Sequence, residues 1–151
     1  MKSALGLRFT ASIAIALAAF WIWAPAAMAA CTDPARPTVD WNRCYHEGRN
    51  LGEVDLTDAK LRGARFNRAE LSGSNLSGID GRRTKFVSAT LQSTNFDGAN
   101  LTEADFTKAD LTGASLRGAN LRGARLFRAN LRGADLTDAR LQAADLLKAD
   151  L

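Results

Sequence analysis

Cys44 and His46 are the residues of this 151-residue chain whose types and spacing come closest to a chemical site. A thiol beside an imidazole can form a nucleophile and its base, but that pair needs a third orienting group and an open cleft. A zinc site built from Cys31, Cys44 and His46 lacks an evident fourth ligand. Because the chain has 1 His and 2 Cys, sites with several histidines are excluded. We therefore expect no catalytic residues, no metal site and no cofactor.

The composition narrows the class of protein further. The chain has 20 Lys and Arg against 16 Asp and Glu, and this formal charge of +4 is too small to argue for nucleic-acid binding. A hydrophobic content of 46% with 3 Pro argues against disorder, and 2 Cys exclude a scaffold dense in disulfides. The acids recur at regular positions, and no pair stands out as a general acid and base. The length predicts one domain.

The first residues have the pattern of an export signal. Lys2 and Arg8 precede an uncharged apolar run over residues 9–23, and an alanine-rich stretch follows. This order is typical of a secretory signal peptide, and the run is short for a membrane-spanning helix, which needs about 20 apolar residues. We expect a helical signal peptide over residues 1–29, cleaved after Ala29 or alternatively after Ala30, and a periplasmic or secreted protein.

Two other interpretations of this segment stay open. The first is an uncleaved anchor. The second is a lipoprotein attached through Cys31, although Met28 stands where a lipoprotein signal usually has Leu. Cleavage removes two cations and no acid, so the formal charge falls from +4 to +2.

A repeat of five residues runs through the remaining chain. Its centre is a large apolar residue at every fifth position from residue 51 to residue 151. Of these 21 centres, 20 are Leu or Phe, and Gly81 is the exception. Two residues before the centre, 15 of 20 positions are Ala. The register extends back to Val39. We therefore assign residues 39–151 to the array and residues 30–38 to an N-terminal capping segment.

A period of five fits neither a helix, with its period of 3.6, nor a long alternating strand. Residues two apart do share one face of an extended segment, and the three others can turn a corner. Glycine often stands two residues after the centre, where a corner needs a permissive backbone. These glycines are Gly63, Gly73, Gly78, Gly98, Gly113, Gly118, Gly123 and Gly133. The pattern predicts a solenoid with one short side per pentad.

Aromatic centres indicate the size of one coil. Phe66, Phe86 and Phe106 are spaced by twenty, so four pentads per coil would stack their rings in one column, where aromatic contact is favourable. The coil is then square, with Leu and Phe in its middle. The array makes about five and a half coils, and at about 4.8 Å per coil the rod is roughly 27 Å long.

The repeat resembles the motif of the pentapeptide-repeat family. Residues 104–106 (Ala-Asp-Phe), 109–111 (Ala-Asp-Leu) and 134–136 (Ala-Asp-Leu) carry the resemblance, which covers essentially the whole chain after residue 38. It implies an all-β fold, the right-handed quadrilateral β-helix. Some members of the family resemble DNA in shape and charge and bind type II topoisomerases, which implies a DNA mimic as an alternative function.

The two cysteines favour a disulfide in an exported protein, because export leads to an oxidising compartment. Cys31 and Cys44 enclose a short loop that contains Pro34 and Pro37, and closing such a loop contributes about 3 kcal/mol. The bond would hold residues 31–38 over the first coil, which otherwise exposes unpaired strand edges.

Gly81 is the one irregular centre. It leaves space where Leu is expected, and the neighbouring Ile79 is larger than the usual Ala. The simpler interpretation is that the two compensate for each other. The alternative is a local bulge that presents Arg82, Arg83 and Lys85.

Outward charges separate into two halves when they are assigned to sides. Side one begins with residues 39–43 and side two with residues 44–48, and each side recurs every twenty residues. Sides one and two carry 14 outward basic residues and six acids, a sum of +8, whereas sides three and four carry two basic residues and nine acids, a sum of −7. The candidate basic surface consists of Arg62, Arg65, Arg82, Arg83, Lys85, Arg122, Arg125 and Arg128.

One outward column of side two becomes apolar along the array. Phe127 and Leu147 occupy it on successive coils, and Leu151 is a centre beside them. These three residues, at the C-terminal end of the array, form a candidate surface for a twofold homodimer. The alternative is a tolerated exposure of stray apolar residues.

The predicted function follows from the array, the charge and the export signal. We expect an exported, non-enzymatic solenoid that acts as a structural or protein-interaction module, and whose basic half can dock on anionic envelope surfaces such as lipid headgroups or acidic glycans. Its partner is an unidentified protein or envelope component, with no nucleic acid and no membrane span after cleavage. A solvated rod without a docking role is the other interpretation. A DNA mimic needs acid around the whole rod, which the basic half contradicts.

Overall fold

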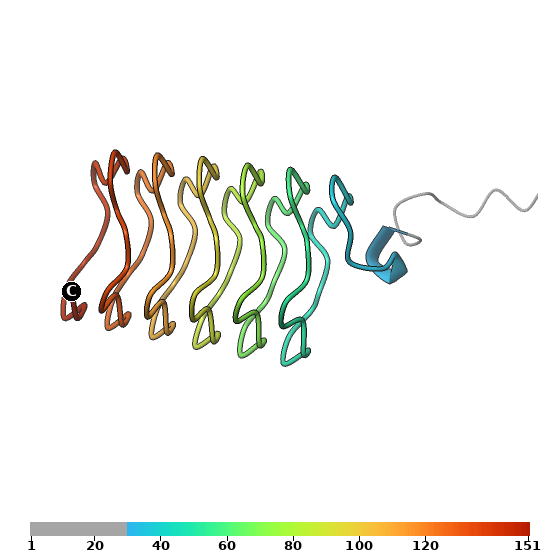
Figure 1. The fold of residues 1–151 in the computed structure, drawn as a ribbon, viewed down its shortest axis with the longest axis horizontal. Coiled ribbons are helices and arrows are strands. Elements are labelled where there is room, and N and C mark those ends of the chain that lie inside the picture. Colours follow the sequence, from blue (N-terminus) through green and yellow to red (C-terminus); the bar gives the residue numbers. More distant parts are fainter. Residues whose placement is uncertain (1–29) are drawn as a thin grey trace, which may run out of the picture.

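The computed structural model describes residues 30–151, so the predicted signal peptide and the cleavage after Ala29 lie outside the described residues. The described part begins with η1 (Ala30–Thr32), a single 3-10 turn. The chain then winds into coils that stack as a rod, with η1 at one end and the last residues at the other (Figure 1). Within residues 30–151, no helix has the length and apolar character needed to cross a membrane.

The coil has four sides. Every bridge is parallel and joins residues twenty apart, from Asp40–Lys60 to Asn130–Asp150, which confirms four pentads per coil. The bridges are isolated, with one residue pair per side, and no longer strand occurs in residues 30–151. A corner every five residues leaves too little extended chain for one. The structure is therefore a four-sided solenoid built from short bridged sides.

Main-chain hydrogen bonds join each coil to the next. On side two, the Phe66 amide donates to the Lys85 carbonyl at 2.7 Å, and the Lys85 amide donates to the Ala64 carbonyl at 2.9 Å. The Arg68 amide adds a bond to the Val87 carbonyl at 2.9 Å. Because this pattern recurs around and along the rod, the backbone of the inner coils has partners without long strands.

The corners need a left-handed backbone. Every fifth residue from Thr38 to Lys148 has a positive φ, and these positions comprise nine glycines and 14 other residues. Glycine adopts this conformation without steric cost. A side chain before the centre supports the corner: Asp55 Oδ1, for example, accepts a hydrogen bond from the Thr57 amide at 3.0 Å.

The centres form the core. Phe66, Phe86 and Phe106 are fully buried and stack with ring centroids 5.4 and 5.0 Å apart, which confirms the predicted aromatic column. Phe96 meets Phe86 and Phe106 edge-on at 5.8 and 5.9 Å. Leu111 is likewise fully buried.

Three buried hydroxyls replace alanine beside the centres. Ser74, Thr84 and Thr94 donate hydrogen bonds to main-chain carbonyls of the preceding coil at 2.8, 2.7 and 2.9 Å. Because each hydroxyl has an acceptor, these polar residues fit the core without an unpaired group.

Ile79 fills the space left by Gly81. A Cβ atom added at Gly81 would lie 3.0 Å from Leu101 Cδ2 and 3.1 Å from Ile79 Cδ1. The ladder continues through this coil, since Asp80 bridges to both Lys60 and Asn100. Mutual compensation is therefore confirmed, and the alternative of a local bulge is wrong.

This packing predicts strong coupling between positions 79 and 81. Gly81→Leu alone should lower the free energy of unfolding by about 1–3 kcal/mol, because the added side chain overfills the coil. Adding Ile79→Ala should recover most of that loss, since the pair then has the usual alanine and leucine. Denaturant unfolding of both single variants and the double variant measures the coupling. Additive losses would contradict the assigned packing.

Candidate interaction surface

Four of the fourteen outward cations on sides one and two are ion-paired. Arg62 and Arg82 both contact Asp80, at 3.3 and 2.6 Å. The other two pairs join residues on neighbouring coils: Arg83 with Glu103 at 2.7 Å, and Arg125 with Asp105 at 3.9 Å. Half of the predicted basic surface is thus locally neutralised, which residue types alone did not indicate.

The other ten cations form no ion pair within residues 30–151. Arg65 instead lies with its guanidinium carbon 5.0 Å from the centroid of the Tyr45 ring. The ten residues are Arg43, Lys60, Arg65, Arg68, Lys85, Lys108, Arg122, Arg128, Arg140 and Lys148. They leave sides one and two with a strong excess of unpaired positive charge.

Four of these ten line one edge of the rod. Arg68, Lys108, Arg128 and Lys148 occupy the left-handed corner position after side two, with φ between 57° and 61°, and all four are exposed. We call this column the cationic corner; Ser88 stands in it between Arg68 and Lys108. This column was not predicted as a separate feature, although the twenty-residue spacing of one corner position was the available signal.

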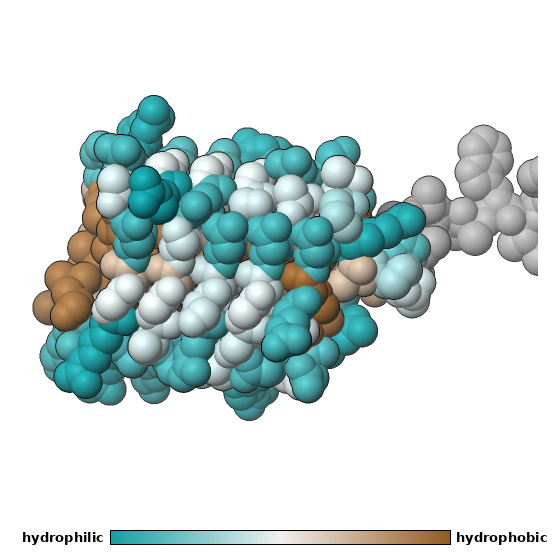
Figure 2. All heavy atoms as spheres, in the orientation of Figure 1, coloured by the Kyte–Doolittle hydropathy of each residue, from teal (hydrophilic) through white to brown (hydrophobic). Residues whose placement is uncertain are grey.

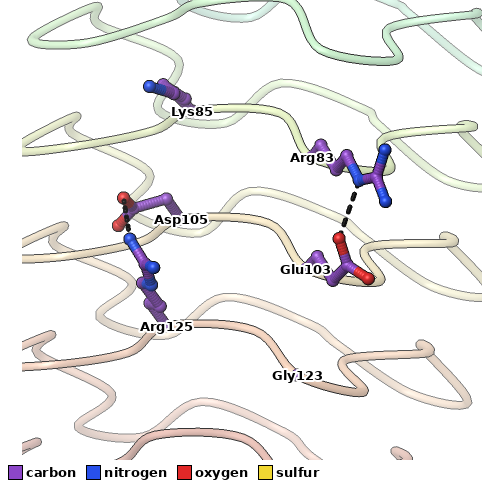
Figure 3. A pocket seen from close by; sticks show the side chains of 6 residues that line it. All are labelled: Arg83, Lys85, Glu103, Asp105, Gly123 and Arg125. Carbon is purple, nitrogen blue, oxygen red and sulfur yellow. Dashed lines mark hydrogen bonds and ion pairs between the residues drawn. The ribbon is translucent and has the colours of Figure 1, made fainter.

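A shallow recess lies between the ion pairs of sides one and two. Its volume is about 360 Å³, and the Arg83–Glu103 and Arg125–Asp105 pairs cross it, while Lys85 stands apart (Figure 3). Since both signs of charge already meet inside this recess, it offers no convergent set of groups for one ligand.

The opposite half stays anionic at neutral pH. Hydrogen bonds from the hydroxyl and the amide of Thr57 hold the pKa of Asp55 below its ordinary value, and Thr137 does the same for Asp135. The two arginines that the repeat places outward on this half are both paired, Arg117 with Asp135 at 3.1 Å, and Arg132 with an acid of the next coil at 2.8 Å.

Apolar side chains reach the surface beside the cationic corner. Phe127 is half-buried, Leu147 is 62% exposed and Leu151 is 76% exposed. The Arg128 amide donates to the Leu147 carbonyl at 3.1 Å, which places the first two on adjacent coils. Figure 2 shows apolar surface gathered at the end of the rod that is farther from the grey residues.

Cys44 and His46, the residues that came closest to a chemical site, lie beside the N-terminal capping segment, residues 30–38, and are both buried. Cys31 and Cys44 form the expected disulfide, with their Cα atoms 5.3 Å apart, and no free cysteine occurs in the described chain. The nucleophile–base pair and the zinc set therefore both lack a thiolate. Among residues 30–151, no three His, Cys, Asp or Glu side chains gather in a way that could hold a metal ion.

His46 is a buried polar centre under this cap. Its ring lies 4.1 Å from the Trp41 ring and 5.2 Å from the Phe66 ring. Nδ1 accepts a hydrogen bond from Arg49 at 2.9 Å, while Nε2 has no partner. Arg49 itself is exposed, although the repeat assigns its position to the inward face. Burial, followed by the Arg49 charge, lowers the pKa of His46 to about 4.

Comparison with known proteins places the repeat in a family. The model of pentapeptide repeats matches residues 47–80, 84–123 and 119–151, in 8 copies. Comparison with curated protein sequences gives no match.

Solved structures of similar proteins come from several sources. HetL, a pentapeptide repeat protein involved in heterocyst differentiation regulation from the cyanobacterium Nostoc sp. strain PCC 7120, is 29% identical with a TM-score of 0.41, over 78% of this chain and 62% of HetL. A pentapeptide repeat protein from the Arabidopsis thaliana thylakoid lumen is 30% identical with a TM-score of 0.45, over 68% of this chain and 65% of that protein.

A third structure is QnrB1, a plasmid-mediated fluoroquinolone resistance protein. It is 20% identical with a TM-score of 0.48, over 73% of this chain and 67% of QnrB1. The chain thus spans less than two thirds of the length of HetL and of the thylakoid protein.

The buried His46 predicts a pH-dependent stability. The pKa of His46 is about 6.5 in the unfolded chain and about 4 in the folded chain. Between these two values the unfolded chain binds a proton at His46 and the folded chain does not. Stability therefore falls with the pH in this range, by about 2 kcal/mol between pH 7 and pH 5. His46→Phe, which continues the aromatic column, should remove that part of the decrease.

Denaturant unfolding of both proteins at pH 7 and pH 5 measures this difference. The carboxylates titrate in both, so their contribution cancels in the comparison. An equal decrease in the two proteins would contradict the assignment of the pH dependence to His46.

Proposed function

The chain belongs to the pentapeptide-repeat family, and from this premise we propose that it acts as a non-enzymatic interaction module that docks on anionic surfaces through sides one and two. The observation that carries the proposal is the set of ten unpaired cations on these two sides, opposite an anionic half. We also infer the finer geometry of the family, a right-handed quadrilateral β-helix, which the four-sided coil supports.

Stacking makes these cations act together. Successive coils are about 4.8 Å apart, and the Debye length is about 8 Å at physiological ionic strength. Neighbouring cations of one column therefore lie within reach of the same anionic groups. An ion-paired arginine such as Arg83 adds little, because its nearest field is cancelled by Glu103.

Export gives this docking a setting. The leader-like residues 1–29 and the disulfide between Cys31 and Cys44 support a periplasmic or secreted protein, because disulfides persist in oxidising compartments. Envelope lipids and acidic glycans are anionic surfaces of that setting. Export also argues against the alternative of a DNA mimic that binds a type II topoisomerase, since such a mimic needs access to the cytoplasm.

Export predicts a defined N-terminus. N-terminal sequencing of the protein from the exported fraction should begin at Ala30 or Cys31, because the cleavage rule favours a cut after Ala29 or Ala30. An intact Met1 on the exported protein would refute cleavage, and a lipid-blocked Cys31 would establish the lipoprotein alternative.

Docking predicts a salt-sensitive interaction that depends on the position of the charge. At low salt the protein should bind polyphosphate and phosphatidylglycerol vesicles, and moderate salt should weaken both interactions. Lys108→Gln with Lys148→Gln should weaken binding about thirtyfold, because each cation near an anionic surface contributes about 1 kcal/mol and about 1.4 kcal/mol is a factor of ten.

Arg117→Gln with Arg132→Gln is the matched control, because it removes the same charge from the anionic half. Equal loss in the two double variants would show that only net charge matters. Absence of binding to either anion at low salt would remove the proposal.

A further inference from the structure

Side two carries an apolar stripe next to the cationic corner. Val87, Phe127 and Leu147 lie directly after a centre, at the first of the two corner positions of the pentad, and Thr107 stands between the first two. The cationic corner occupies the following position, so each stripe residue precedes a corner residue in the chain. The two features form parallel lines along the same edge of the rod.

We propose that this edge binds an anionic lipid bilayer, with Phe127 and Leu147 inserted at the level of the headgroups and the cationic corner on the lipid phosphates. This inference rests on the proposed function and names the source of the anionic surface. Apolar side chains flanked by Lys and Arg are the arrangement that anchors proteins at a membrane interface.

Phe127 and Arg128 show how one pair serves both parts of the interface. The Arg128 guanidinium carbon lies 5.3 Å from the centroid of the Phe127 ring. A long cationic side chain can extend toward a phosphate while the ring beside it enters the apolar layer. Leu147 follows on the next coil and is 62% exposed, so it needs no rearrangement of the core to insert.

The corner also has the shape for a flat partner. From Arg68 to Lys148 it spans four coils, roughly 19 Å at about 4.8 Å per coil, in a line along the edge of the rod. A planar surface can meet every residue of such a line, together with the stripe that runs beside it.

Charge complementarity favours this partner over a second copy of the chain. Twofold pairing through the stripe would bring the cations Lys108, Arg128 and Lys148 of both copies into one interface, and these cations have no ion-pair partner within residues 30–151. Side two has two acids on these coils that could offset the cations, and both already have partners. Asp105 pairs with Arg125 at 3.9 Å, and Asp145 accepts a hydrogen bond from the Leu147 amide.

A soluble polyanion is also a poorer fit than a bilayer. It would satisfy the cationic corner but leave Leu147 in water, whereas a bilayer offers phosphates and an apolar layer a few ångströms apart. The two anions therefore differ in what they do to the stripe, and this difference can be measured.

The decisive experiment places a fluorescent reporter in the stripe. Phe127→Trp in the full chain should shift its emission to shorter wavelength on phosphatidylglycerol vesicles and be quenched by brominated lipid, but show no such shift on polyphosphate. Thr137→Trp is the matched control, because Thr137 is exposed at the same corner position of side four, and it should stay unshifted. The other tryptophans are common to both variants.

A loss-of-contact variant tests the energy of insertion. Phe127→Ser with Leu147→Ser should weaken vesicle binding about tenfold or more, since burial of one such side chain is sufficient for that change, and should leave polyphosphate binding unchanged. Both side chains point outward, so an unchanged thermal unfolding transition serves as the control for the fold.

The outcomes separate this inference from the proposed function. Vesicle binding with an unshifted Phe127→Trp, or with no loss in the serine variant, overturns insertion while electrostatic docking stands. Absence of binding to both vesicles and polyphosphate overturns docking itself. A dimer in light scattering that Leu147→Glu abolishes would assign the stripe to a second copy and also overturn the inference.

Discussion

The vertical hydrogen-bond ladder is the constraint on which the rest of the structure depends. On each side it bridges one residue to the residue twenty positions later, as in the bridge between Arg65 and Lys85, and it holds the same register from the first coil to the last. Any property that recurs every twenty residues therefore becomes a straight column. The aromatic stack inside the rod and the cationic corner outside it are two results of the same register.

The core could be predicted from the sequence because the inward positions have strict size limits. A centre must fill the coil and its neighbour must be small, so the departure at Gly81 immediately suggested Ile79 as its compensation, and the packing agrees. The disulfide was similarly accessible, because Cys31 and Cys44 flank a short segment before an array whose first coil needs covering. These inferences use steric fit, which residue types largely determine.

The surface was less predictable, because the formation of an ion pair depends on side-chain geometry as well as on the side of the coil that carries the residue. Arg83 and Lys85 look equivalent in a count of charges, yet Arg83 reaches Glu103 and Lys85 reaches no acid within the described coils. Arg49 departs from the pattern for a related reason. Its position faces inward in later coils, but beside the first coil its long side chain remains exposed and binds the ring of His46.

The five positions of a pentad have different structural roles, and this explains how the fold and a binding surface can change independently. Two positions face the core and one corner position needs a left-handed backbone, while the outward side chains are free of packing limits. A partner must therefore be recognised along columns instead of within a cavity. Because the two corner positions are consecutive in the chain, an apolar stripe and a charged line such as those of Phe127 and Arg128 come to lie side by side, and an extended, planar, anionic partner is the kind of surface that such an edge can meet.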